Sequence, residues 1–286
     1  MNKQIIESKQ FDQERALYNL TDAEVRSCMF SGPADGESAL KECRRVTVRD
    51  CTFSLRYPLW HAEGYELVGS CLDEKTRAPI WYARDGLIEG CRIDGVKCLR
   101  ECDNTVVRGS SIHSPEFGWR CRGLTLEKSE IESEYFLFEC RDVEVRELRM
   151  KGKYSFQYVE NMVIRDSYLD TKDAFWHSKN VRVENSTVRG EYLGWFAEGL
   201  TLVNCHIVGT QPLCYCKNLK LIDCTMEGTD LSFEYSEVEA DIKGEILSVK
   251  NPKSGYITAD AIGETVYEGS ILTSECRVSV REIAGV

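Results

Sequence analysis

The sequence predicts an all-β protein, a single-stranded parallel β-helix (solenoid) in which each coil contains three short strands. Three observations predict this fold: a repeat of about 19 residues, apolar residues that alternate with polar ones, and turn residues at fixed places in each repeat. The runs "AFWHSKNVRVENSTV" (174–188) and "GWFAEGLTLVNCHI" (194–207) show the repeat, because their aromatic, turn, apolar and small positions coincide. We expect about 11 coils, stacked at the strand spacing of roughly 4.8 Å.

One small residue in each repeat marks the register between coils. From Cys91 onward this ladder position recurs every 19 residues, whereas the earlier steps are 23, 19 and 21 residues long, so the first coils carry insertions. Residues one repeat apart therefore become vertical neighbours. The ladder position holds Cys28, Cys51, Ser70, Cys91, Ser110, Ser129, Leu148, Ser167, Ser186, Cys205 and Cys224.

Two short runs in each repeat alternate apolar and polar residues with a period of two, which predicts strands. Val181 and Val183 form the first run of one repeat, and Ser186 and Val188 form the second. The pair "EN" (184–185) between them tolerates the left-handed backbone of a sharp corner. The rest of each repeat, such as "EYFLFEC" (134–140), predicts a third strand, because no repeat has room for a capped helix.

Two columns of the third strand are expected to face the interior. The final position is small and uncharged in every repeat, which suits a tight corner: Ala62, Ala83, Cys102, Cys121, Cys140, Val159, Ser178, Ala197 and Cys216. Two residues earlier lies a ring column that shares this parity, so we expect a buried aromatic stack, with an exposed sugar-binding strip as the alternative. The ring column contains Trp60, Trp81, Trp119, Phe138, Trp176, Trp195 and Phe233, interrupted by Arg100, Gln157 and Cys214.

The two ends of the solenoid require caps, because open coil ends expose sheet edges. We expect residues 1–20 to form an N-terminal strand or helix cap, with a short helix over residues 9–18. The β-helix itself is expected over residues 21–244. Residues 245–286 lose the repeat and are expected to form a small C-terminal β-rich cap, with a hairpin or turn at 251–256.

Composition disfavours several classes of partner. The formal charge of −11 argues against nucleic acid and anionic membranes, which both favour basic surfaces. The chain shows no membrane-length apolar run and no secretory leader, so a cytoplasmic location is expected. The 14 cysteines contain no CxxC pair and do not cluster with the four histidines, so we expect buried free thiols, no metal site and no cofactor.

Several long runs carry a resemblance to a known family. "SGPADGESALKECRRVTVRDCTFSLRYPLWHAEGYELVGS", "DTKDAFWHSKN" and "GEYLGWFAEGL" resemble the bacterial domain-of-unknown-function family 3737 over nearly the whole chain. The resemblance implies a right-handed parallel β-helix of pectate-lyase-like architecture and no assigned activity. That architecture is common among polysaccharide-cleaving enzymes, but the "DD", "GHG" and "RIK" pattern of polygalacturonases and the Asp cluster of pectate lyases are absent.

The candidate site is an outward column of the third strand that is rich in aromatic residues and lacks lysine. It contains His61, Tyr82, Glu101, Arg120, Glu139, Tyr158, His177, Phe196, Tyr215 and Glu234. We expect ligand binding at His61, Tyr82, Arg120, Glu139, Tyr158, His177 and Tyr215.

Glu101, Arg120 and Glu139 of this column are the weak catalytic candidates. Two coils would separate the carboxylates by about 9–10 Å, near the upper limit for an inverting glycosidase. An arginine between them favours their ionised forms, which is wrong for a general acid. A charge ladder that fixes register is the simpler interpretation. Asp35 and Glu37 on a glycine-bearing loop are a further candidate, for a cation.

Three functions remain open on this basis. The first is a ligand-binding or interaction module, with carbohydrate or another polar small molecule on the third-strand face. The second is a carbohydrate-active enzyme, a polysaccharide hydrolase or lyase. The third is a scaffold that presents its surface to a protein partner whose identity the sequence does not indicate.

Overall fold

The computed structural model describes residues 3–32 and 37–282, and these residues form strands joined by turns, with no helix among them. The chain divides into two compact units, Met1–Arg149 and Met150–Val286. Each unit is a right-handed parallel β-helix, with about 14 turns in total rather than the 11 expected.

The first unit contains 17 strands. They are β1 (Gln4–Glu7), β2 (Gln10–Phe11), β3 (Thr21–Arg26), β4 (Met29–Phe30), β5 (Arg44–Arg49), β6 (Thr52–Phe53), β7 (Glu66–Val68), β8 (Cys71–Leu72), β9 (Arg84–Glu89), β10 (Arg92–Ile93), β11 (Cys98–Arg100), β12 (Asp103–Arg108), β13 (Ser111–His113), β14 (Glu116–Trp119), β15 (Arg122–Glu127), β16 (Glu130–Phe136) and β17 (Arg141–Arg146).

The remaining strands begin with β18, which starts at the last residue of the first unit. They are β18 (Arg149–Ser155), β19 (Glu160–Arg165), β20 (Tyr168–Lys172), β21 (Lys179–Glu184), β22 (Thr187–Arg189), β23 (Glu198–Val203), β24 (His206–Val208), β25 (Leu219–Glu227), β26 (Glu237–Lys243), β27 (Glu245–Lys250), β28 (Ser254–Ala259), β29 (Ala261–Val266) and β30 (Arg277–Val280).

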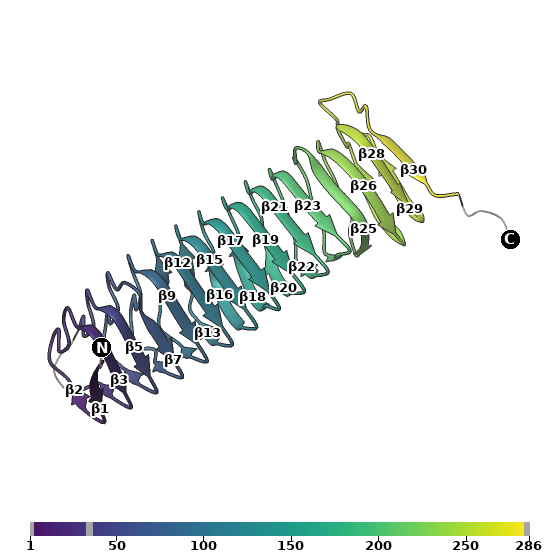
Figure 1. Cartoon of the computed structure of the whole chain (residues 1–286). Coiled ribbons are helices and arrows are strands. Elements are labelled where there is room, and N and C mark those ends of the chain that lie inside the picture. The colour runs from purple at the N-terminus through teal and green to yellow at the C-terminus, as the bar shows by residue number, and fades with distance from the viewer. Residues whose placement is uncertain (1–2, 33–36, 283–286) are drawn as a thin grey trace. The chain divides into compact units, whose positions relative to one another are not determined.

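Every coil pairs in parallel with the same side of the next coil. In the first unit β3 pairs with β5 and β12 with β15, and in the second β19 pairs with β21 and β21 with β23, as the stacked arrows of Figure 1 show. Arg122 pairs with Arg141, one repeat of 19 residues away, so the repeat length read from the sequence is confirmed.

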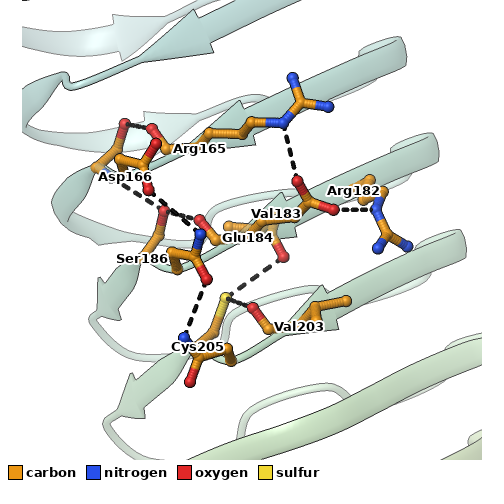
Figure 2. Close-up of polar contacts among 11 residues, drawn as sticks. Arg165, Asp166, Arg182, Val183, Glu184, Ser186, Val203 and Cys205 are labelled. Carbon is orange, nitrogen blue, oxygen red and sulfur yellow. Dashed lines mark hydrogen bonds and ion pairs between the residues drawn. The ribbon is translucent and has the colours of Figure 1, made fainter.

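The ladder position explains why cysteine and serine alternate there. The backbone N–H of Ser167 donates to Ser186 Oγ at 3.0 Å, and that hydroxyl donates to the carbonyl of Glu184 at 2.7 Å. Cys205 Sγ lies 3.4 Å from the carbonyl oxygens of Val183 and Val203 (Figure 2). A small side chain that both donates and accepts satisfies backbone groups at the corner, which either residue can do.

The buried file of small residues is also confirmed. Cys102, Cys121 and Cys140 of the first unit are each at most 1% exposed. The backbone N–H of Cys102 contacts Cys121 Sγ at 3.5 Å, so the two residues are vertical neighbours. Ala197 and Cys216 of the second unit are equally buried.

The ring column does not point inward as expected, because the third side is not a regular strand. Alternate residues there adopt left-handed backbone, with φ of 53° at Leu137, 55° at Glu139, 61° at Phe175 and 54° at His177. This conformation breaks the period of two on which the parity argument rested. The inner column lies one residue earlier and includes Leu59, Ile80, Leu99, Leu137, Phe156, Phe175 and Leu213.

The tryptophans therefore lie half-buried on the outside of the third side: Trp60, Trp81, Trp119, Trp176 and Trp195. Phe233 is the exception and is fully buried, since an extra residue in its repeat moves it into the inner column, where its N–H bonds to the carbonyl of Pro212.

Both end segments continue the coils instead of forming separate caps. Gln4 of β1 pairs in parallel with Ala23 of β3, and β2 pairs with β4, so the helix expected over residues 9–18 is absent. At the other end β27 pairs with β29 and β28 with β30, all in parallel, with a turn rather than a hairpin at 251–256. The sequence hid these coils because their steps, 16 residues from Glu245 to Ala261 and 21 from Tyr256 to Arg277, differ from 19.

Candidate functional site

The outward column of the second unit forms a continuous stack of rings. The ring centroids of Tyr158 and His177 lie 5.0 Å apart, those of His177 and Phe196 4.9 Å, and those of Phe196 and Tyr215 4.8 Å. The planes of neighbouring rings differ by at most 12°. We call this stack the ring ladder; its rings cover each other's faces and turn their edges to solvent.

The ring ladder ends on Tyr235 instead of the expected Glu234. The extra residue that buries Phe233 places the Tyr235 ring 5.9 Å from the Tyr215 ring. Glu234 instead accepts a hydrogen bond from the Tyr215 hydroxyl at 3.3 Å and pairs with Lys250 at 2.9 Å. Burial and the neighbouring Glu234 carboxylate raise the pKa of Tyr215 to about 12, so the phenol remains a hydrogen-bond donor at neutral pH.

The first unit contains a shorter version of the same column. The rings of His61 and Tyr82 stack at 5.1 Å, with 16° between their planes. Further along, Arg120 Nε donates to Glu139 at 2.7 Å. The column of the first unit therefore changes from aromatic to charged along its length.

A groove runs beside the ring ladder, because the next residue of each coil is small and points inward. In the second unit a hollow of about 290 Å³ lies between the rings of His177, Phe196 and Tyr215 and three charged side chains. Those three side chains are Lys179, Glu198 and Lys217. In the first unit a hollow of about 410 Å³ has the same position, with His61 and Tyr82 among its lining residues.

The far wall of each groove is a row of charges of alternating sign. In the first unit Glu63 pairs with Arg84 at 2.8 Å and with Arg44 at 3.8 Å. In the second unit Lys179 and Lys217 lie in register on either side of Glu198. Within the part of the chain that the structure describes, these three residues form no ion pair. The sequence argument missed this row, although the alternation at 19-residue spacing can be read in the sequence.

The three catalytic candidates do not assemble into one site. Arg120 is ion-paired with Glu139, and this hydrogen bond is the main cause that raises the pKa of Arg120. Glu101 forms no ion pair among the described residues and acts on Arg120 only through its charge. An exposed ion pair leaves no carboxyl group that is set apart as a general acid.

The tryptophan row lies next to the ring ladder and stabilises the third side. Trp176 Nε1 donates to the carbonyl of Tyr192 at 2.7 Å, and Trp195 Nε1 donates to that of Gln211 at 2.8 Å. The two unexpected members of this row are paired. Gln157 Nε2 donates to the carbonyl of Asp173 at 3.0 Å, and Arg100 pairs with Glu116 at 2.7 Å.

Arg100 also lies between two indole rings. Its guanidinium carbon is 4.5 Å from the centroid of Trp81 and 4.7 Å from that of Trp119. The arginine therefore continues the stack of the first unit as a cation between two aromatic faces.

The other chemical candidates gain little from the structure. Asp35 lies outside the described residues, and Glu37 pairs with Arg56 at 3.2 Å. No group of three or more possible metal ligands occurs in residues 3–32 and 37–282. None of the described residues belongs to a helix long and apolar enough to cross a membrane.

Comparison with known proteins settles the family. The profile described as "Protein of unknown function (DUF3737)" matches residues 4–279. The chain belongs to this family. No curated protein matches the DUF3737 chain.

Solved structures resemble this DUF3737 chain in fold. The surface adhesin PfbA of Streptococcus pneumoniae has a TM-score of 0.51 at 6% identity, and the match covers 82% of this chain and 83% of PfbA. The A-module of the mannuronan C-5 epimerase AlgE4 of Azotobacter vinelandii has a TM-score of 0.34 at 9% identity, covering 96% and 89%. At such identities the likeness shows the fold alone.

Proposed function

We propose that this DUF3737 protein is a non-catalytic binding module whose third-side groove takes an elongated, uncharged polyhydroxyl ligand, an oligosaccharide. The observation that carries the proposal is the groove of the second unit, with ring edges along one wall and Lys179, Glu198 and Lys217 along the other. The groove of the first unit repeats this arrangement around His61 and Tyr82.

The alternating signs of the charged wall favour an uncharged ligand. A polyanion would approach Glu198 as closely as Lys179 and Lys217, and a polycation would meet the reverse conflict. Sugar hydroxyls both donate and accept hydrogen bonds, so one chain of them can satisfy lysine and glutamate in turn.

The ring ladder offers edges and polar tips, because its faces are covered by neighbouring rings. Ring edges carry partial positive charge and therefore contact oxygen atoms favourably. Phe196 is 43% exposed, which leaves its edge open to a ligand. The proposed ligand thus lies along the ladder and does not stack on a single ring face.

Turnover is disfavoured by the state of the acidic residues. Glu139 is held by Arg120 and Glu234 by Lys250, and neither groove holds a pair of carboxyl groups in distinct environments. A cytoplasmic location belongs to the same proposal, supported by 14 free cysteines, which persist in a reducing compartment.

Calorimetric titration with neutral hexasaccharides (cello-, xylo-, manno- and malto-hexaose) tests the proposal, with a polyuronate for comparison. We expect at least one neutral saccharide to bind, and His177→Ala and Lys217→Ala to weaken it by about tenfold or more, since each removes a groove contact. Lys220→Ala, which breaks the Lys220–Glu239 ion pair outside the groove, is the matched control.

Two outcomes contradict the proposal. One is a tight response to the polyuronate alone, which would indicate a site for anions. The other is release of shorter saccharides by the wild type that stops in Glu139→Gln, which would indicate an enzyme.

A further inference from the structure

The charges beside the groove of the second unit differ from other charges of that unit in having no partner. Arg165 and Arg182 both pair with Glu184, and Lys220 pairs with Glu239. Lys179, Glu198 and Lys217 are exposed, yet they form no ion pair among the described residues. Their charges are available to a partner.

These three charges belong to a longer row of alternating sign. Glu160 pairs in register with Lys179, Lys179 with Glu198, and Glu198 with Lys217. Glu237 continues the row, because its N–H bonds to the carbonyl of Cys216 just as the N–H of Lys217 bonds to that of Ala197. The order along the row is therefore acid, base, acid, base, acid.

The spacing of the row restricts its partner. Successive charges lie one coil apart, roughly 4.8 Å, which is the distance between neighbouring strands of a sheet. A row of opposite charges with the same repeat occurs on the side of another β-solenoid. An extended peptide does not match it, because side chains on one face of a strand are spaced by two residues, roughly 6.6 Å.

We propose that the third-side face of the second unit binds a second copy of this chain in a two-fold, antiparallel arrangement. A two-fold axis reverses the order of the row and places a patch against itself. When the axis lies between two coils, every acid of one copy faces a base of the other. Glu198 then faces Lys217 of the second copy, or Lys179 if the axis lies one coil nearer the N-terminus.

The ring ladder supplies the apolar part of this contact. Tyr158 is 47% exposed and Phe196 43%, and both lie beside the charged row in one continuous stack. Aromatic residues are enriched at the centres of protein interfaces, with charged residues around them. Each copy would cover the groove of the other, so the dimer and the proposed saccharide compete for the same face.

The inference is tested without saccharide, so its failure leaves the proposed function standing. Sedimentation velocity on the full chain is expected to show a concentration-dependent monomer–dimer equilibrium. Glu198→Lys places like charges opposite each other at two symmetric points, so we expect the dimer Kd to rise by at least about tenfold. Lys220→Glu, which reverses a charge in the same direction as Lys217→Glu but outside the groove, is expected to leave the Kd unchanged.

Mixing of variants gives the sharper test. If Glu198 faces Lys217, an equimolar mixture of Glu198→Lys and Lys217→Glu forms a heterodimer while each variant alone is weakened. If Glu198 faces Lys179, the mixture with Lys179→Glu does so instead. A wild type that stays monomeric up to about 1 mM overturns the proposal. So does a dimer that Glu198→Lys leaves intact, or one that neither mixture restores.

Discussion

Side-chain N–H groups of the tryptophan row connect each coil to the next. Trp81, Trp176 and Trp195 donate to a carbonyl 16 residues further along the chain. Gln157 makes the same bond with its amide, and Arg100 reaches Glu116, also 16 residues away. What the members of this row share is a donor at a fixed reach, which is why glutamine and arginine can replace indole.

We predict that Trp176→Phe lowers the free energy of unfolding by about 1 kcal/mol, because the carbonyl of Tyr192 loses its donor while the ring stack with Trp195 is kept. Urea unfolding followed by circular dichroism measures the change. Trp195→Phe should cost a similar amount, since its indole bonds to Gln211. Equal stability of wild type and both variants would show that solvent replaces the lost bond.

At the scale of strands, one inward column of the first unit contains an exchange of volume between neighbouring coils. Val46, Tyr65 and Gly86 occupy successive places in this column, on β5, just before β7, and on β9. A Cβ atom at Gly86 would overlap the ring of Tyr65, which is 1% exposed. The glycine therefore gives space to the tyrosine below it.

We predict strong coupling between these two positions. Tyr65→Val leaves a cavity, and Gly86→Val forces the Tyr65 ring to move, so each change alone should cost about 3 kcal/mol. The double variant places valine at both positions, as at Val46 and Val143 of the same column, and should recover at least about 2 kcal/mol of that loss. Guanidinium unfolding of the four proteins measures the coupling, and additive costs would contradict it.

The same scale explains what could be predicted from the sequence. Two sides of each coil are regular strands, so their period of two gave the correct inward residues, such as Val181 and Val183. The third side alternates left-handed residues such as Phe175 and His177 with ordinary ones, so the period of two misplaced Trp176. No pattern of apolar residues reports a backbone conformation of that kind.

The candidate site divides in the same way. The outward column could be found, because vertical neighbours follow from the repeat length alone. The groove and its unpaired charges depend on side-chain distances: Arg84 reaches Glu63, whereas Lys179 does not pair with Glu198 in the equivalent place. A sequence contains both arrangements as the same alternation of signs.

At the scale of the whole molecule, the 14 cysteines report how completely the interiors of the two units exclude solvent. All are free, and those other than Cys71 and Cys276 are buried. Burial raises the pKa of Cys43 and Cys216 to about 12, far above neutral pH. Thiolates are the reactive form, so these thiols are protected both by access and by ionisation.

We therefore predict that a thiol reagent such as 5,5′-dithiobis(2-nitrobenzoic acid) at pH 8 modifies at most the two half-buried cysteines of the native protein. Even these should react slowly, because burial raises the pKa of Cys71 and brings that of Cys276 to about 11. All 14 thiols should react in denaturant. Cys71→Ser combined with Cys276→Ser should reduce the native count to zero, whereas rapid modification of further thiols in that double variant would show that the coils open in the native state and that their columns are not a closed core.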